Sequence, residues 1–159
     1  MIALHIITLN SQSSIFNLFA ELATLTLCQF AAEALLHEMM EAVAQRLKGE
    51  GAECWCNGCV IADKSQHVDN NTLIDHQVSH CTSHELYKYV LDDKATGAFA
   101  GRVLVRHDAQ KTVSEEVNQN LCATKTARMY TQPMLEIYAD DVKCSHGSTV
   151  GQLNDAALF

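Results

Sequence analysis

Apolar and polar residues follow two different patterns, and the change falls near Gly49. Before this glycine, apolar residues recur at every fourth position, as one face of a helix requires: Leu27, Ala31, Leu35, Met39, Val43 and Leu47. The same stretch is rich in Ala, Leu, Glu and Met, which favour helix. Arg46 and Lys48 stand in the last turn, and a glycine after them is a common helix end. The pattern therefore predicts an amphipathic helix over residues 27–48.

Short β-prone segments replace this pattern after Gly49. They span residues 54–61, 72–78, 98–105, 117–122 and 134–139, with polar breaks at 63–65, 69–71, 92–94 and 140–141. Short strands at fairly regular intervals are typical of an all-β sandwich, barrel or solenoid, and periodicity alone does not choose among them. The small residues at 95–101 would let backbones approach closely, as stacked turns or a tight sheet corner require.

Composition narrows the function classes. A chain of 159 residues with 48% hydrophobic content suits one domain with a real core. The net charge of -8 offers no basic surface for nucleic acid. No run of about eighteen apolar residues predicts a membrane span, and the apolar start at residues 1–9 lacks the basic region of a signal peptide. Seven cysteines among eight histidines therefore indicate reduced thiols in a cytoplasmic protein.

Cysteines and histidines gather in the first half of the β region: Cys54, Cys56, Cys59, His67, His76, His80, Cys81 and His84. Thiolates and imidazoles bind zinc and iron–sulfur clusters, so a metal site is one interpretation. The spacing favours another, because Cys54 and Cys56 share one face of a strand while Cys59 lies on the other. We therefore expect small cysteines that fill the interior, and histidines that are exposed or hydrogen-bonded. A cysteine-based nucleophile site has no local signature here.

A second group of reactive residues lies at 140–147, Asp-Asp-Val-Lys-Cys-Ser-His-Gly. In an extended chain, Val142, Cys144 and His146 share one face, with about 7 Å between alternate Cα atoms. Such a pair could ligate iron together or hold a persulfide near a base. Lys143 and the imidazole could favour the thiolate, the form that binds metal. The residues alone leave open an ordinary buried cysteine beside a hydrogen-bonded histidine.

The run over residues 135–153 resembles the signature of the SufB/SufD family, and its core Val-Lys-Cys-Ser-His-Gly looks like the SufD branch. Further blocks at residues 49–54, 66–70, 80–83 and 108–112 follow in the family's order. The similarity covers residues 46–159. It implies a right-handed parallel β-helix, a solenoid in which each turn buries its inward residues against its neighbours.

The resemblance also implies a function. The chain would be a scaffold subunit of the Suf iron–sulfur cluster assembly complex, not an enzyme, with ATPase activity in the partner SufC. Its β-helix would pair with SufB, and a cluster would form transiently at their interface, with no tightly bound cofactor in the isolated chain. Carried over by motif, His146 would be an iron ligand or proton carrier, and Cys144 a thiol at the seam. A flavin is associated with such complexes, but no residue here binds it recognisably.

Two features depart from the family. Residues 1–48 are predicted as an N-terminal strand and a helical segment that could cap the open end of a β-helix core at 49–159. Family members also continue into a helical domain that docks SufC, which is apparently missing after Phe159, so we expect weak SufC binding. A homodimer through the SufB surface is possible. The alternatives are a stand-alone Cys/His metal-binding β-domain, an inactive truncated β-helix fragment and, last, a hydrolase or transferase.

Overall fold

Ten strands form two facing sheets in the computed structural model, which describes residues 2–10 and 38–153. Sheet A has the order β1-β3-β5-β7-β10, and sheet B the order β2-β4-β6-β8, with β9 also paired to β6. The described residues contain no helix, and so none that could span a membrane. The strands are β1 (Ile2–Asn10), β2 (Glu38–Leu47), β3 (Glu53–Ala62), β4 (His67–His76), β5 (Thr82–Leu91), β6 (Thr96–Val105), β7 (Val113–Cys122), β8 (Arg128–Thr131), β9 (Met134–Ile137) and β10 (Lys143–Gln152).

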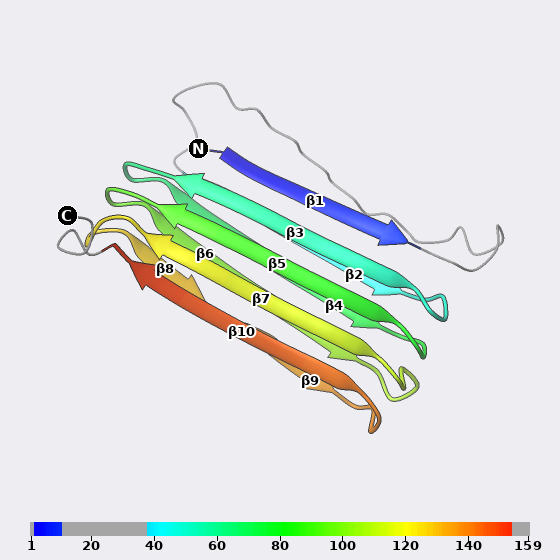
Figure 1. Ribbon diagram of the computed structural model, residues 1–159. Helices are drawn as coiled ribbons and strands as arrows, with labels where there is room; N and C mark the ends of the chain where they lie inside the picture. The colour runs from blue at the N-terminus through cyan, green and yellow to red at the C-terminus, as the bar shows by residue number, and fades with distance from the viewer. Residues whose placement is uncertain (1, 11–37, 154–159) are drawn as a thin grey trace.

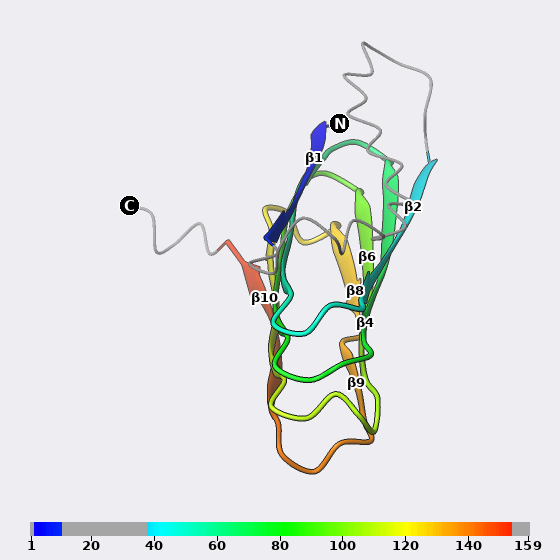
Figure 2. The same ribbon diagram turned by 90° about the vertical axis from the view of Figure 1, so that its right-hand side faces the viewer.

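The chain alternates between the two sheets, so that each turn contributes one strand to each wall (Figures 1 and 2). From β2 onward, neighbouring strands in each sheet run parallel and in unbroken register. In sheet A, for example, Cys54 lies beside Ser83, Ser83 beside Ser114, and Ser114 beside Cys144. Parallel strands stacked turn upon turn make a β-solenoid. This confirms the fold that the family resemblance implied and selects it over the sandwich and the barrel.

Alternation along each strand places the core between the walls. In β6, every second residue from Gly97 to Val105 is buried, as the period of two in an extended chain requires. The ring of Phe99 on β6 packs on Tyr87 of β5, with ring centroids 4.9 Å apart. The buried apolar side chains include Val60, Val68, Ile74, Tyr89, Leu91, Val103 and Val105.

Two glycines of β6 let the walls approach each other, as the small-residue run at 95–101 suggested. A Cβ at Gly97 would come within 3.0 Å of the Tyr89 and Leu91 side chains. A Cβ at Gly101 would overlap the Oε1 atom of Glu116 on β7. Side chains of sheet A therefore fill the interior at these two positions, together with Met129 of β8 at Gly97 and Phe99 at Gly101.

The corners between strands repeat from turn to turn. Lys64 and Asp93 adopt left-handed φ angles of 55° and 50° at one corner, and His80 and Lys111 both have φ of 61° at the other. Backbone hydrogen bonds join the stacked corners, for example from Lys94 N to Lys64 O at 2.8 Å. The same local geometry at successive corners keeps the strands in register.

The predicted helix over residues 27–48 is wrong where it can be compared with the structure. Residues 38–47 form β2, which pairs in parallel with β4, so this part belongs to the solenoid and does not cap it. Residues 27–37 lie outside the described residues. The helix-favouring composition is overridden here by hydrogen bonding to the β4 edge. The expected N-terminal strand is present as β1, which pairs antiparallel with β3. The division into domains at residue 49 stays a prediction.

The strand predictions after Gly49 differ in quality. The segments at 54–61, 98–105 and 117–122 each fall on an observed strand, 134–139 extends two residues beyond β9, and 72–78 overlaps the second half of β4. The expected break at residues 69–71 is wrong, because Asp69, Asn70 and Asn71 lie inside β4. β5 and β8 were not predicted, and β5 carries His84, Glu85 and Lys88 among its apolar residues.

Candidate functional site

Cys144 and His146 lie on β10, the outermost strand of sheet A. β10 continues the parallel register, with Cys144 beside Ser114 and His146 beside Glu116. Ser114 and Glu116 are buried on the inner face of β7. Residues that are paired in register point to the same side of a sheet, so Cys144 and His146 lie on the inner side as well. No described strand follows beyond β10 in sheet A, and His146 is exposed while Cys144 is half-buried. The expected extended tail with an accessible thiol and imidazole on one face is therefore present.

Burial raises the pKa of the Cys144 thiol, and the Ser114 backbone N–H offsets part of this rise. The thiol also packs against the hydrophobic core. Lys143, which was expected to favour the thiolate, is exposed and one position away in the strand, so alternation turns it to the opposite face. The resting thiol is thus protonated, and a partner group or a metal ion would have to draw the proton away.

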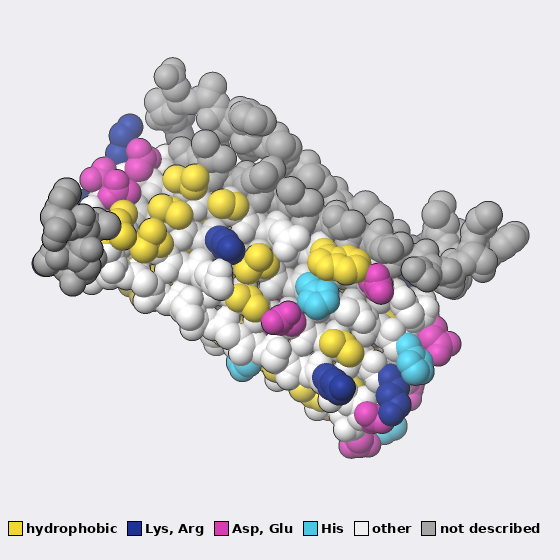
Figure 3. Space-filling view, in the orientation of Figure 1, with side chains coloured by type: hydrophobic (Ala, Val, Ile, Leu, Met, Phe, Trp, Pro, Cys, Tyr) yellow, Lys and Arg dark blue, Asp and Glu magenta, His cyan; other side chains and the backbone are white. Residues whose placement is uncertain are grey.

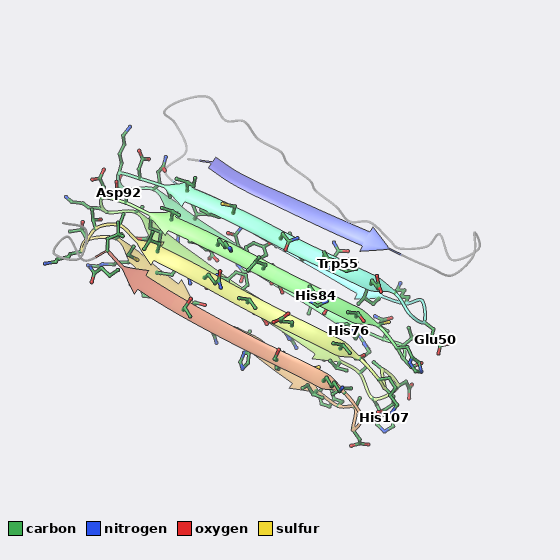
Figure 4. All side chains as sticks on the ribbon, in the orientation of Figure 1. Glu50, Trp55, His76, His84, Asp92 and His107 are labelled. Carbon is green, nitrogen blue, oxygen red and sulfur yellow. The ribbon has the colours of Figure 1, made fainter. Side chains whose placement is uncertain are left out.

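A buried hydrogen-bond chain lies directly below Cys144. His76 at the end of β4 reaches across the interior, and its Nε2 is 2.9 Å from the Ser83 hydroxyl on β5. The Ser83 hydroxyl is in turn 2.8 Å from the Ser114 hydroxyl on β7. All three side chains are buried. Burial lowers the pKa of His76 to about 4, so its imidazole is neutral, and Figure 4 labels this residue near one end of the middle strands.

Two buried carboxyl groups lie below His146. Glu85 on β5 and Glu116 on β7 are neighbours in register, 2% and 0% exposed, and their four carboxyl oxygens have no hydrogen-bond partner among the described residues. Burial raises the pKa of Glu85 to about 7, and the nearby Thr72 hydroxyl opposes this rise. Burial, and then the adjacent Glu85, raise the pKa of Glu116 well above its usual range. This pair therefore holds protons at pH values where an ordinary carboxyl group has lost them.

The sequence analysis did not single out Glu85 and Glu116. The available signal was alternation: Glu85 is in phase with Tyr87 and Tyr89, which are apolar enough to mark an inner face. Glu116 lies in a polar strand, and only the register with β5 shows that it points inward. Polar residues in a strand normally indicate its solvent side, which is why this pair was missed.

The first cysteine–histidine group does not come together. Cys54 and Cys56 are buried on the inner face of β3, and Cys59 is exposed on the outer face, as the spacing predicted. Among the described residues, no three His, Cys, Asp or Glu side chains are placed to hold a metal ion. Burial, with a smaller contribution from Glu85, raises the pKa of Cys54 to about 12, which suits an interior thiol.

The histidines of this group have separate environments. His76 is buried and hydrogen-bonded, whereas His80 is exposed at a corner with its Nε2 3.9 Å from Glu50 Oε1. His84 lies on the outer face of sheet A, where its ring stacks on Trp55 at a centroid distance of 5.8 Å (Figure 4). Its Nδ1 is 3.5 Å from Glu115 Oε2. The expectation of exposed or hydrogen-bonded histidines is confirmed for these three.

The outer face of sheet A carries apolar side chains that are unrelated to the Cys144 and His146 pair. Ile61 and Val90 are neighbours in register there and are 47% and 37% exposed. Figure 3 shows hydrophobic side chains over this face of the molecule. A shallow groove of about 400 Å³ is lined by Val90 and Leu121 of this face and also by Val150 of β10. Val150 is in phase with Cys144 and His146, so the groove reaches from the outer face of sheet A to the side of β10 that carries this pair.

The structure defines the class of fold, a parallel β-solenoid with a cysteine and a histidine on β10, and comparison with known families identifies which solenoid family this is. The family described as "SUF system FeS cluster assembly, SufBD core domain" matches residues 13–159. The chain belongs to this family and is SufD-like.

Individual relatives agree with this assignment. The chain is 40% identical over 114 residues to the iron–sulfur cluster assembly protein SufD of Escherichia coli, which covers 72% of this chain and 27% of that protein. It is 40% identical over 94 residues to a SufBD family protein of Synechocystis, covering 59% of this chain and 21% of that protein. A Mycobacterium leprae SufBD family protein is 34% identical over 122 residues, covering 72% of this chain and 31% of that protein. The chain thus spans less than a third of the length of these relatives.

Proposed function

We propose that this chain forms the core of a scaffold subunit for iron–sulfur cluster assembly, and that it pairs with a SufB-like subunit in the cytoplasm. The observation that carries the proposal is the position of Cys144 and His146 in phase on the exposed last strand of sheet A. The family assignment indicates the process, iron–sulfur cluster assembly, and β10 carries the side chains that would take part in it. ATPase activity would belong to SufC in the same assembly.

The edge of β10 suits pairing with another subunit. An edge strand presents a row of N–H and C=O groups that can accept a further strand. A strand added beside β10 would extend sheet A and put the two side chains at a seam between subunits. Val150, 53% exposed on the same strand, would be covered by such a partner. The solenoid thus offers a binding edge and a reactive pair in one element.

The two side chains would perform different tasks on the cluster, which is the cargo of the assembly. The exposed imidazole of His146 could bind iron through a ring nitrogen, as in clusters with mixed cysteine and histidine ligands. The Cys144 sulfur would become an iron ligand after losing its proton. Since both groups come from one strand, a partner would need to complete the ligand set. The isolated chain is therefore expected to release the cluster.

Replacement of His146 tests the proposal in a reconstituted complex with SufB and SufC. We expect His146→Ala to abolish cluster formation, followed by iron–sulfur absorption, while circular dichroism and thermal unfolding stay unchanged because this side chain is exposed. His84→Ala is the matched control, since it removes a histidine from the outer face of the same sheet. Normal assembly with His146→Ala would remove this residue from the function.

Gel filtration with purified SufB tests the pairing separately. A stable complex of the two chains is expected, and elution of this chain alone would favour the inactive fragment. A homodimer that SufB does not displace would show that β10 binds a second copy instead. Stoichiometric zinc in the purified chain would favour the stand-alone metal-binding domain.

A further inference from the structure

Two buried asparagines lie on the inner face of β7, beside the edge strand β10. Asn118 and Asn120 are 0% and 6% exposed, and their register neighbours on β5 are Tyr87 and Tyr89. An amide group in this interior costs free energy unless its hydrogen bonds are made. The hydrogen bonds of these two amides therefore indicate what the asparagines do in the fold.

Asn120 uses both protons of its side-chain amide. Its Nδ2 donates to the Thr149 carbonyl of β10 at 3.0 Å and to Asn118 Oδ1 at 2.5 Å. Turning the amide over would put its oxygen against these two acceptors, so the network fixes its orientation. Asn118 Nδ2 donates in turn to the Tyr87 carbonyl of β5 at 3.3 Å. The two amides thus join three neighbouring strands of sheet A, of which β10 is the last.

Ser148 of β10 extends this network to the opposite sheet. Its hydroxyl lies 3.4 Å from Asn118 Oδ1 and 3.0 Å from the Thr131 hydroxyl of β8. The corner before β10 is held differently, because Lys111 pairs there with Asp141 and both side chains are more than half exposed. Exposed ion pairs contribute little to stability. The buried amides are therefore the stronger side-chain attachment of β10.

The hydrogen bond from the β7 amide does not use the free edge of β10. Lys143 N donates to Thr112 O, on the side of β7. In a parallel strand the main-chain groups of successive residues point to opposite neighbours. Thr149 is in phase with Lys143 and also faces β7, whereas the main-chain groups of Cys144 and His146 face the open edge. The amides can thus hold β10 while its edge stays available for another strand.

We propose that Asn118 and Asn120 are positioning residues, which hold β10 in the extended form that a partner strand can join. The inference rests on the proposed function and deepens it, because it names the side chains that prepare this edge for pairing. A strand that is already ordered loses less conformational entropy when it binds. Cys144 and His146 lie on the strand that is held in this way, so the same amides fix the place of both side chains at the seam.

Amide hydrogen exchange in the isolated chain, followed by mass spectrometry, tests the attachment without a partner. Asn120→Leu keeps a branched side chain of similar shape but cannot donate a hydrogen bond. We expect exchange in peptides from β10 to become about tenfold faster, the size of one to two lost hydrogen bonds. Gln119→Leu is the matched control, since this side chain is exposed on the outer face of β7, and it should not change the exchange of β10.

A second control separates positioning from a general loss of stability. Val68→Ala removes volume from the core on β4 of sheet B, where the valine is 0% exposed. It should lower the temperature of unfolding without speeding exchange in β10, because an edge strand opens locally and not through global unfolding. Unchanged exchange of β10 in Asn120→Leu, or equal acceleration by Val68→Ala, would overturn the inference.

Calorimetric titration with purified SufB tests the consequence for pairing. We expect Asn120→Leu to weaken binding by about tenfold, whereas Val68→Ala should bind like the wild type at a temperature where both are folded. Faster exchange of β10 together with wild-type affinity would overturn the inference, since the order of the strand would then not matter for pairing. If the wild type itself does not bind SufB, the proposed function fails, whereas faster exchange in Asn120→Leu still supports the attachment of β10 by these amides.

Discussion

Where β6 of sheet B faces β5 and β7 of sheet A, the two walls contribute different chemistry to the same interior, although elsewhere both walls bury polar and apolar side chains. The inner face of β6 in sheet B is apolar, with Phe99, Val103 and Val105 fully or almost fully buried. The inner faces of β5 and β7 in sheet A carry buried hydroxyl, amide and carboxyl groups, including Glu85 and Glu116. Both walls have the same strand length and parallel pairing. The backbone therefore does not distinguish them, and side-chain chemistry does.

The apolar and the polar inner faces should affect the free energy of unfolding differently. Burying apolar side chains stabilises the fold, whereas burying a carboxyl group without a hydrogen-bond partner costs free energy. The polar strands β5 and β7 belong to sheet A, whose edge strand β10 carries Cys144 and His146. We infer that the apolar side chains of β6 offset the cost of the buried carboxyl groups on β5 and β7, so that removing Phe99 and neutralising Glu85 should change stability in opposite directions.

The largest effect on stability is expected on the apolar inner face of β6. Phe99→Ala removes a ring that packs on Tyr87 and should lower the free energy of unfolding by about 3–5 kcal/mol. Urea denaturation followed by circular dichroism measures the change. Val113→Ala is the control, because this valine is 40% exposed and should change stability by less than about 1 kcal/mol. Equal losses for the two variants would contradict the position of Phe99 in the core.

On the inner face of β5, Glu85→Gln should stabilise the protein at alkaline pH. An unfolded carboxyl group ionises near its ordinary pKa of 4.5, whereas the buried Glu85 keeps its proton up to about pH 7. Between these values the folded state binds more protons, so Glu85 lowers stability as pH rises, by ~1.4 kcal/mol per pH unit. The variant lacks this loss and should exceed the wild type by on the order of 3 kcal/mol at pH 8.

The comparison is best made as the stability difference between variant and wild type at each pH, since other groups titrate in the same range. The lowered pKa of His76 acts in the opposite sense, because stability rises with pH while the unfolded imidazole alone binds the proton. Glu115→Gln, which removes a carboxyl group on the outer face of β7, is the matched control. A difference that does not grow between pH 5 and pH 8 would show that Glu85 is not a buried, neutral acid.

The smallest effect on stability is expected where Gly101 of β6 lies against Glu116 of β7. Gly101→Ala adds a Cβ that overlaps the Glu116 carboxyl group, and the displaced side chain should cost about 1–3 kcal/mol. If the contact is the cause, the loss should disappear in the double variant Gly101→Ala with Glu116→Ala, measured against Glu116→Ala alone. Additive losses in this double-mutant cycle would mean that the glycine is needed for another reason.

The sequence by itself determined the strands around Cys56, Phe99 and Leu121, and the motif that identifies the family and points to Cys144 and His146. Period-two alternation and turn residues are local signals, and a motif is read directly from neighbouring residues. Those features needed no knowledge of what lies across the interior.

Only the tertiary structure decided the conformation of residues 38–47 and the buried hydrogen-bond chain below Cys144. Helix-favouring residues form β2 because β4 offers its edge, an interaction absent from any local window of sequence. His76, Ser83 and Ser114 are far apart in sequence, and register between strands brings their side chains within hydrogen-bond distance. Side-chain spacing along a strand is local, but stacking between turns depends on where each corner ends, and that is settled only when the strands pair.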